Sequence, residues 1–226
     1  MEFYLDTANL NAIDSALDLY PIAGVTTNPT ILSKETMSDV FAHLKAIQKL
    51  LGPDRSLHVQ TLSDTAEGII AEAAVLRQHV GNTVYVKIPT TSEGLKAMKQ
   101  LHKQGVRITA TAITSKLQAY LAINAGADYV APYVNRMENL DIDAMDVLSS
   151  IASYISNANS STRIIAASFK NLAQINGAID AGVHAVTIDP SFYTLACSSA
   201  HLQKTVDDFK ADFEKAFGKD KTFLDL

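Results

Sequence analysis

Residues 83–111, TVYVKIPTTSEGLKAMKQLHKQGVRITAT, contain one complete strand–helix–strand unit. The first run, 83–88, alternates apolar and polar residues, as a strand does. Residues 92–105 place apolar side chains three and four positions apart, which predicts a helix, and Gly105 supplies its stop. The next alternating run, 106–111, predicts a second strand. Two strands joined by a helix of this length predict a parallel βαβ unit.

The same unit recurs along the whole chain. We expect strands over 2–6, 22–27, 56–60, 83–88, 106–111, 128–133, 162–168 and 184–188, with helical patterns such as 65–80 between them. Each unit takes about 28 residues, close to the ~30 of a βαβ unit. No linker or low-complexity tract interrupts the series. We therefore predict an α/β fold, a (β/α)₈ TIM barrel forming a single domain over 1–226. An open doubly wound sheet is the alternative, but the sequence has no glycine-rich dinucleotide fingerprint to support it.

Alternation within the predicted strands assigns side chains to the two sides of the barrel wall. Val84, Val86 and Ile88 share the apolar parity that faces the helices, which leaves Tyr85 and Lys87 inward. By the same parity Tyr4, Asp6, His58, Gln60, Arg107, Thr109 and Thr111 point inward.

Polar residues lie at or near the C-terminal ends of seven of the eight predicted strands. They are Asp6, Asn28, Gln60, Lys87, Thr111, Tyr133 and Ser168. The carboxyl ends of the strands form the face on which barrels of this kind carry out chemistry. Convergence from seven strands predicts a candidate active site; the alternative is a hydrogen-bonded rim that only closes the loops.

Composition narrows the class of protein. With 226 residues, 47% hydrophobic, and a net charge of −5, the chain has no basic footprint for nucleic acid. A single cysteine excludes an internal disulfide, and no Cys/His cluster indicates a structural zinc site. The N-terminus does not resemble a signal peptide, and no run approaches 18 apolar residues. We expect a cytoplasmic protein without a nucleic-acid or membrane partner.

Lys87 is the sharpest single feature. An inward lysine in so apolar a strand is removed from water, which disfavours the ammonium and lowers its pKa. A neutral amine can attack a ketone and form an imine, which accepts electrons when an adjacent carbon–carbon bond breaks. The alternative is a structural lysine paired with Asp6 or another carboxylate, which would raise its pKa. The residues alone leave both interpretations open.

Five segments resemble the transaldolase family, in its order and at its spacing, across nearly the whole chain. They are YLDTAN (4–9), GVTTNPTIL (24–32), VKIPTTSEGLKA (86–97), APYVNRME (131–138) and AASFKN (166–171). The resemblance implies a class I aldolase type of barrel whose Schiff-base lysine lies on the fourth strand. Lys87 is on the fourth predicted strand. The family's imine already supplies the electron sink, so we expect no cofactor and no metal.

The resemblance also implies roles for other residues. Asp6 corresponds to an aspartate that handles substrate hydroxyls and proton transfer, and Asn28, with Thr26, to groups that bind the three-carbon dihydroxyacetone unit. Arg136 and Ser168 correspond to residues that hold the terminal phosphate of the sugar. Lys170 stands where many members carry a second arginine, so it offers phosphate a point charge in place of a bidentate fork.

Two positions separate aldolases from transaldolases in this family. True transaldolases usually carry glutamate on strand three and phenylalanine on strand six, whereas this chain has Gln60 and Tyr133, with Thr111 at the place of a water-holding threonine. This pattern resembles the fructose-6-phosphate aldolase subgroup and implies reversible cleavage of fructose 6-phosphate to dihydroxyacetone and glyceraldehyde 3-phosphate. Transfer of the dihydroxyacetone unit to an aldose phosphate is the alternative. A catalytically silent sugar-phosphate binding protein is a third, from another class.

An additional helix is predicted near the C-terminus, over 200–217. Within it Leu202, Val206, Phe209, Phe213 and Phe217 form one apolar stripe. By itself this is the pattern of a packing helix. Small members of the family use the corresponding helix to clasp a neighbouring subunit, which implies a homo-oligomer, a pentamer or a decamer.

Overall fold

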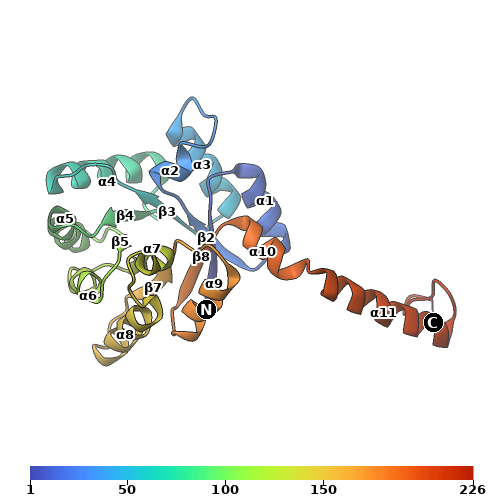
Figure 1. Ribbon diagram of the computed structural model, residues 1–226. Coiled ribbons are helices and arrows are strands. Elements are labelled where there is room, and N and C mark those ends of the chain that lie inside the picture. The colour runs from blue at the N-terminus through green and yellow to red at the C-terminus, as the bar shows by residue number, and fades with distance from the viewer. Residues whose placement is uncertain (226) are drawn as a thin grey trace. The chain divides into compact units, whose positions relative to one another are not determined.

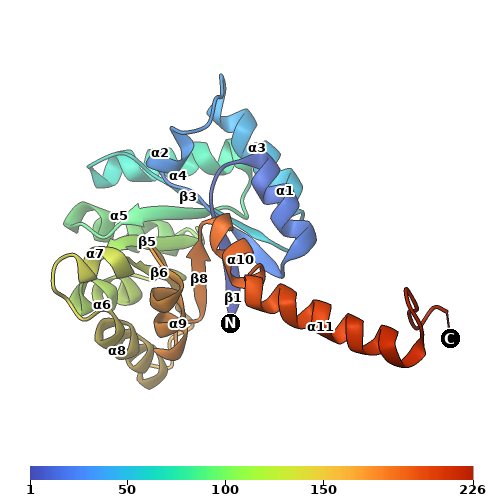
Figure 2. The same ribbon diagram turned by 45° about the vertical axis from the view of Figure 1, so that its right-hand side comes forward.

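The computed structural model describes residues 1–225, and eight parallel strands form a closed barrel in chain order. Figure 1 and Figure 2 show the strands at the centre with helices around them. The strands are β1 (Glu2–Asp6), β2 (Ile22–Thr26), β3 (Ser56–Gln60), β4 (Tyr85–Pro89), β5 (Ile108–Ile113), β6 (Tyr129–Pro132), β7 (Arg163–Ala166) and β8 (Ala185–Ile188). The predicted (β/α)₈ barrel is confirmed.

The helices follow the strands in alternation. Those of the outer layer are α1 (Leu10–Leu19), α3 (Val40–Leu51), α4 (Ala66–Val80), α5 (Ser92–Lys103), α6 (Lys116–Asn124), α8 (Ala144–Asn157) and α9 (Leu172–Asp180). Two short helices that the periodicity did not predict, α2 (Pro29–Leu32) and α7 (Val134–Glu138), follow β2 and β6. The predicted stop at Gly105 is confirmed, since its φ of 68° lies in the left-handed region just after α5.

The predicted strand bounds are close to those observed, and the fifth differs for a physical reason. Predicted over 106–111, it runs over Ile108–Ile113. At its start, the Val106 N–H bonds to the carbonyl of Leu101 in α5, so it is not available to a neighbouring strand. At its end, the register with β6 shifts between Ala110 and Ile113, which marks one extra residue on β5, a β-bulge.

The barrel interior has the predicted parity. Val84, Val86 and Ile88 are fully buried on the helix side. His58 lies inside, where its ring stacks on Tyr85 with centroids 4.5 Å apart. The Nδ1 atom of His58 lies 2.8 Å from the hydroxyl of Thr109. This aromatic and polar layer fills the barrel below the strand ends that carry the site.

Two compact units divide the chain. The first, residues 1–190, holds the whole barrel, and the second begins at Ser191. The second unit contains α11 (Ala200–Phe217), which has the predicted bounds of the C-terminal helix; α10 (Pro190–Cys197) spans the boundary. The single domain over 1–226 stays a prediction. None of the helices described is long and apolar enough to cross a membrane.

Candidate active site

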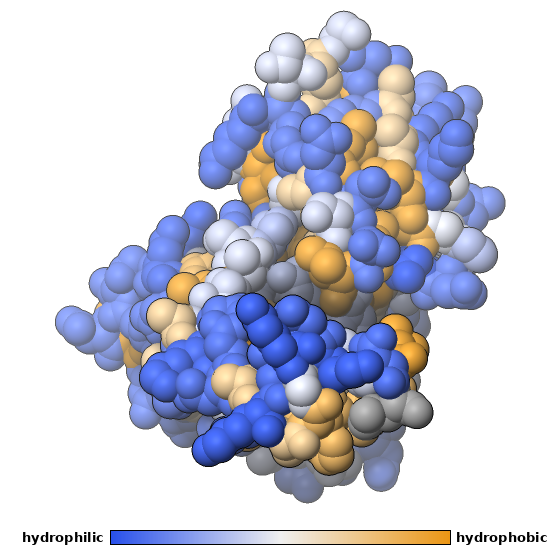
Figure 3. All heavy atoms as spheres, turned by 90° about the vertical axis from the view of Figure 1, so that its right-hand side faces the viewer, coloured by the Kyte–Doolittle hydropathy of each residue, from blue (hydrophilic) through white to orange (hydrophobic). Residues whose placement is uncertain are grey.

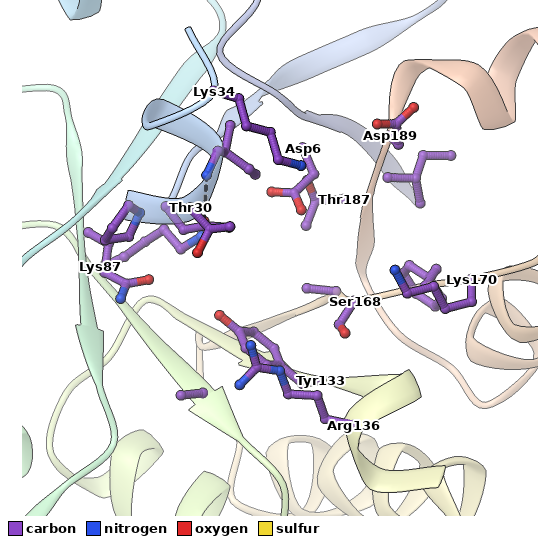
Figure 4. Close-up of a pocket in the computed structure, with 18 residues that line it drawn as sticks. Asp6, Thr30, Lys34, Lys87, Tyr133, Arg136, Ser168, Lys170, Thr187 and Asp189 are labelled. Atoms are coloured by element: carbon purple, nitrogen blue, oxygen red, sulfur yellow. Dashed lines mark hydrogen bonds between the residues drawn. The ribbon is translucent and has the colours of Figure 1, made fainter. Parts of the chain in front are cut away.

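A cavity of about 460 Å³ opens where the strands end. Eight of the ten predicted site residues line it, namely Asp6, Asn28, Gln60, Lys87, Tyr133, Arg136, Ser168 and Lys170 (Figure 4). The other two, Thr26 and Thr111, are buried beside it and bond to lining residues. The structure therefore brings the predicted set together.

Lys87 is removed from water, and the pKa of its amine is lowered. It is 4% exposed, and burial lowers the pKa of its amine, while the charge of Asp6 partly opposes that effect. Its Nζ donates a 2.8 Å hydrogen bond to the carbonyl of Thr27. Within residues 1–225 no carboxylate lies within 4.0 Å of Nζ. Of the two interpretations left open by the sequence, this environment favours the reactive amine over the ion pair.

The carbonyl that receives Lys87 is itself fixed. The Thr27 backbone N–H donates to the carbonyl of His58 at 2.9 Å, and its hydroxyl donates to the same oxygen at 3.2 Å. Thr27 is fully buried. A held acceptor aims the amine at the cavity in one geometry, which limits the entropy lost when a substrate is attacked.

Asp6, half-buried at the end of β1, lines the same cavity as Lys87. Burial raises the pKa of Asp6, and the charge of Lys87 and a hydrogen bond from Thr26 oppose this rise. The Thr26 hydroxyl donates to Asp6 Oδ1 at 2.7 Å, and the Thr187 hydroxyl lies 2.7 Å from that of Thr26. Thr26 therefore contacts Asp6 and does not itself line the cavity. A carboxylate with a raised pKa is a stronger base than an exposed one.

Tyr133 stands across the cavity with its phenol bonded to Thr111. The two hydroxyl oxygens lie 2.9 Å apart, and Thr111 is fully buried. Burial raises the pKa of the phenol, against hydrogen bonds from Thr111 and from the Ala112 backbone. The phenol is therefore protonated near neutral pH and can donate.

The bulge in β5 brings the Ala112 backbone to this point. Ala112 has a φ of 59°, in the left-handed region that costs a non-glycine residue roughly 1–3 kcal/mol. It lines the cavity although its neighbour Thr111 also points inward. The strained backbone of Ala112 thus lies at the β-bulge, where β5 borders the cavity.

Gln60 and Asn28 present amide groups close to Lys87. Gln60 ends β3 directly opposite Lys87 in the strand register. The Asn28 side-chain oxygen accepts the Ile31 N–H at 3.0 Å and so caps α2. That bond leaves the amide nitrogen of Asn28 to meet a substrate hydroxyl.

Cations gather on another side of the cavity. Arg136 comes from α7, while Ser168 and Lys170 come from the segment between β7 and α9 (Figure 4). Ser168 has a φ of 64°, again in the left-handed region, and its carbonyl accepts the N–H of Asn135 at 2.8 Å. A guanidinium, an ammonium and a hydroxyl around one space suit a phosphate group.

Sequence reasoning missed four polar residues of the site. Thr30, Lys34, Thr187 and Asp189 also line the cavity. Asp189 directly follows β8, so the strand-end rule that identified the other seven would also have identified it. Lys34 points toward Asp6 in Figure 4, and its charge lowers the pKa of that carboxyl. No periodic signal marks Lys34, because it lies in a loop.

Among the residues described, no group of three or more His, Cys, Asp or Glu side chains could hold a metal.

Comparison with known proteins points to the same family that the five sequence segments resemble. The family model for transaldolase/fructose-6-phosphate aldolase matches residues 3–220. A curated protein of Streptococcus pneumoniae (strain ATCC 700669 / Spain 23F-1), described as a probable fructose-6-phosphate aldolase, is 47% identical over 213 residues, covering 94% of this chain and 96% of that protein. With this match, a closed barrel and a buried lysine on β4, the chain belongs to the transaldolase/fructose-6-phosphate aldolase family.

Proposed function

We propose that this protein is a class I aldolase that reversibly cleaves fructose 6-phosphate to dihydroxyacetone and glyceraldehyde 3-phosphate through an imine on Lys87. The observation that carries the proposal is the Lys87 amine, which is buried with a lowered pKa beside a polar cavity. The description of the pneumococcal relative supports the choice of substrate.

The first steps use Lys87 as the nucleophile. The neutral amine attacks C2 of the open-chain ketose, and the carbinolamine loses water to give a protonated imine. Asn28 and Gln60 hold hydroxyls of the three-carbon unit. Asp6, whose pKa is raised, accepts and returns protons during these steps.

Bond cleavage follows from the charge on the imine. A base, for which Asp6 is our assignment, removes the C4 hydroxyl proton while the C3–C4 bond breaks. The bonding electrons move into the imine and leave a neutral enamine on Lys87, and C4 departs as the aldehyde of glyceraldehyde 3-phosphate. Arg136, Ser168 and Lys170 would hold its phosphate throughout.

The fate of the enamine distinguishes an aldolase from a transaldolase. In an aldolase, C3 gains a proton and water hydrolyses the resulting imine, which frees dihydroxyacetone and the Lys87 amine. Tyr133 is our candidate donor of that proton, directly or through a water that it holds with Gln60 and Thr111. In a transaldolase the enamine waits for another aldehyde. The phenol at Tyr133 is the feature that favours release.

One assay tests the proposal most simply. Purified protein receives fructose 6-phosphate without an acceptor aldehyde, and free dihydroxyacetone is followed over time. An aldolase produces it in many turnovers, and Lys87→Met, which keeps a chain of similar length without an amine, produces none. Release of glyceraldehyde 3-phosphate limited to one equivalent per site, without free dihydroxyacetone, would indicate a transaldolase that holds the enamine. No product and no adduct on Lys87 would indicate a binding protein.

We further propose that the protein is a cytoplasmic homo-oligomer, a pentamer or a decamer. α11 has no buried residue, and the stripe members Leu202, Val206, Phe209 and Phe217 are exposed. Figure 3, viewed toward the end of α11, has hydrophobic side chains at the surface beside hydrophilic ones. Exposed apolar stripes of this kind are typical of contact surfaces. The family's use of this helix between subunits supports the assignment.

A further inference from the structure

Gln174 is a buried polar side chain whose bonds all leave its own helix. It is 7% exposed and lies in the first turn of α9. Its carbonyl oxygen accepts the Lys170 backbone N–H at 2.7 Å. Its amide nitrogen donates to Glu138 Oε2 at 2.5 Å and to Asn135 Oδ1 at 3.3 Å. Every polar atom of the side chain is therefore paired.

These partners lie on the two segments that carry the cations of the cavity. Asn135 and Glu138 flank Arg136 in α7, and Lys170 belongs to the segment that leads from β7 to α9. One backbone bond already joins the segments, from the Asn135 N–H to the carbonyl of Ser168 at 2.8 Å. Gln174 adds a side-chain bridge between them, with one amide bonded to both.

We propose that Gln174 is a positioning residue for phosphate recognition, which fixes α7 and the Lys170 segment at the separation that one phosphate group requires. The inference rests on the proposed function, since it takes Arg136, Ser168 and Lys170 as the phosphate site. Arg136 and Lys170 are exposed, and long exposed side chains lose rotamer freedom on binding. Fixing their backbones does not remove that loss, but it avoids the further cost of ordering the two segments and keeps both cations within reach of one phosphate.

The test compares two acceptors that differ only by a phosphate. Aldol addition of dihydroxyacetone to glyceraldehyde 3-phosphate and to glyceraldehyde is measured for wild type and Gln174→Met, which keeps the length of the side chain and removes its hydrogen bonds. We expect KM for the phosphorylated acceptor to rise on the order of tenfold, with kcat and the unphosphorylated reaction within about twofold. Equal changes for both acceptors, or no change for either, would overturn the inference.

A matched control is Gln118→Met. Gln118 makes the same local bond, since its carbonyl oxygen accepts the Thr114 N–H at 2.9 Å four residues earlier. Among residues 1–225, however, its side chain bonds only to Thr114 and Ser115. We expect this variant to show no preference between the two acceptors. A selective loss in Gln118→Met equal to that in Gln174→Met would contradict a specific role for the bridge.

A second pair of variants, which exchanges the glutamine and the glutamate, separates loss of the bridge from loss of folding. Gln174→Glu alone places a second carboxylate against Glu138 and should weaken the bridge, whereas adding Glu138→Gln restores one donor facing one acceptor. Recovery of phosphate preference in the double variant supports the bridge, and failure to recover in a folded double variant overturns it. Arg136→Ala distinguishes the two proposals: if it discriminates between acceptors and Gln174→Met does not, only the inference fails. If Arg136→Ala does not discriminate, the phosphate site and the inference fail together.

Discussion

Replacing Tyr133 by phenylalanine removes one oxygen atom and keeps the ring. The ring itself contacts Arg136, whose guanidinium carbon lies 5.1 Å from the ring centroid, and that contact is retained. What disappears is the hydroxyl that lies 2.9 Å from Thr111 Oγ1. The substitution therefore tests proton donation to the enamine with little other change to the cavity.

The expected effect on release is large. Burial raises the pKa of Tyr133, so the phenol carries its proton near neutral pH and is available as an acid. Loss of a general acid typically costs 10²–10⁴-fold, or about 3–5 kcal/mol of transition-state stabilisation. Thr111 also loses a partner while fully buried, which should reduce the free energy of unfolding by about 1–3 kcal/mol.

Two rates must be measured in the same preparation. The first is dihydroxyacetone release from fructose 6-phosphate alone, and the second is transfer to erythrose 4-phosphate. We expect release in Tyr133→Phe to fall by about 10²–10⁴-fold and transfer to fall much less or to rise, because the enamine lives longer. A thermal melt separates lost stability from lost chemistry.

An unchanged ratio of release to transfer would show that the Tyr133 hydroxyl does not protonate the enamine. If both rates dropped together, Tyr133 would serve packing at the barrel mouth. If neither dropped, another group would supply the proton. In either case the main ground for aldolase over transaldolase would be removed.

Three further predictions concern charge, assembly and metal. In Asp6→Asn, the carboxylate that raises the pKa of Lys87 is gone, so imine trapping with dihydroxyacetone should extend to lower pH; a shift to higher pH would contradict the electrostatic account. Phe209→Asp, at a side chain 69% exposed in α11, should give smaller species by light scattering, and a monomeric wild type at micromolar concentration would contradict the oligomer. EDTA should leave cleavage unchanged because the imine provides the electron sink; inhibition reversed by added metal would argue against it.

Much of the barrel could be predicted because its strands obey a period of two. The residues around Lys87 show this most clearly, since apolar Val86 and Ile88 on either side fixed the direction of the lysine. The bulge near Ala112 could not be predicted in this way. It depends on how β5 pairs with β6, and a single extra residue leaves no pattern in the sequence of one strand.

The residues of the site could likewise be predicted only in part. Residues at strand ends, such as Asp6 and Gln60, could be predicted because all parallel strands end on one face. Lys34 and Gln174 could not, because a loop lysine and a glutamine in a first helical turn are usually solvated. Only the tertiary structure brings Gln174 to Glu138. The short helices α2 and α7, of four and five residues, are too brief to show a helical period.

Covalent capture with borohydride identifies the residue that forms the imine. Protein incubated with fructose 6-phosphate or dihydroxyacetone is treated with borohydride, digested and examined by peptide mass. We expect one reduced three-carbon adduct with dihydroxyacetone, located on Lys87, and none in Lys87→Met. An adduct on another lysine, or cleavage activity that persists in Lys87→Met, would contradict this expectation.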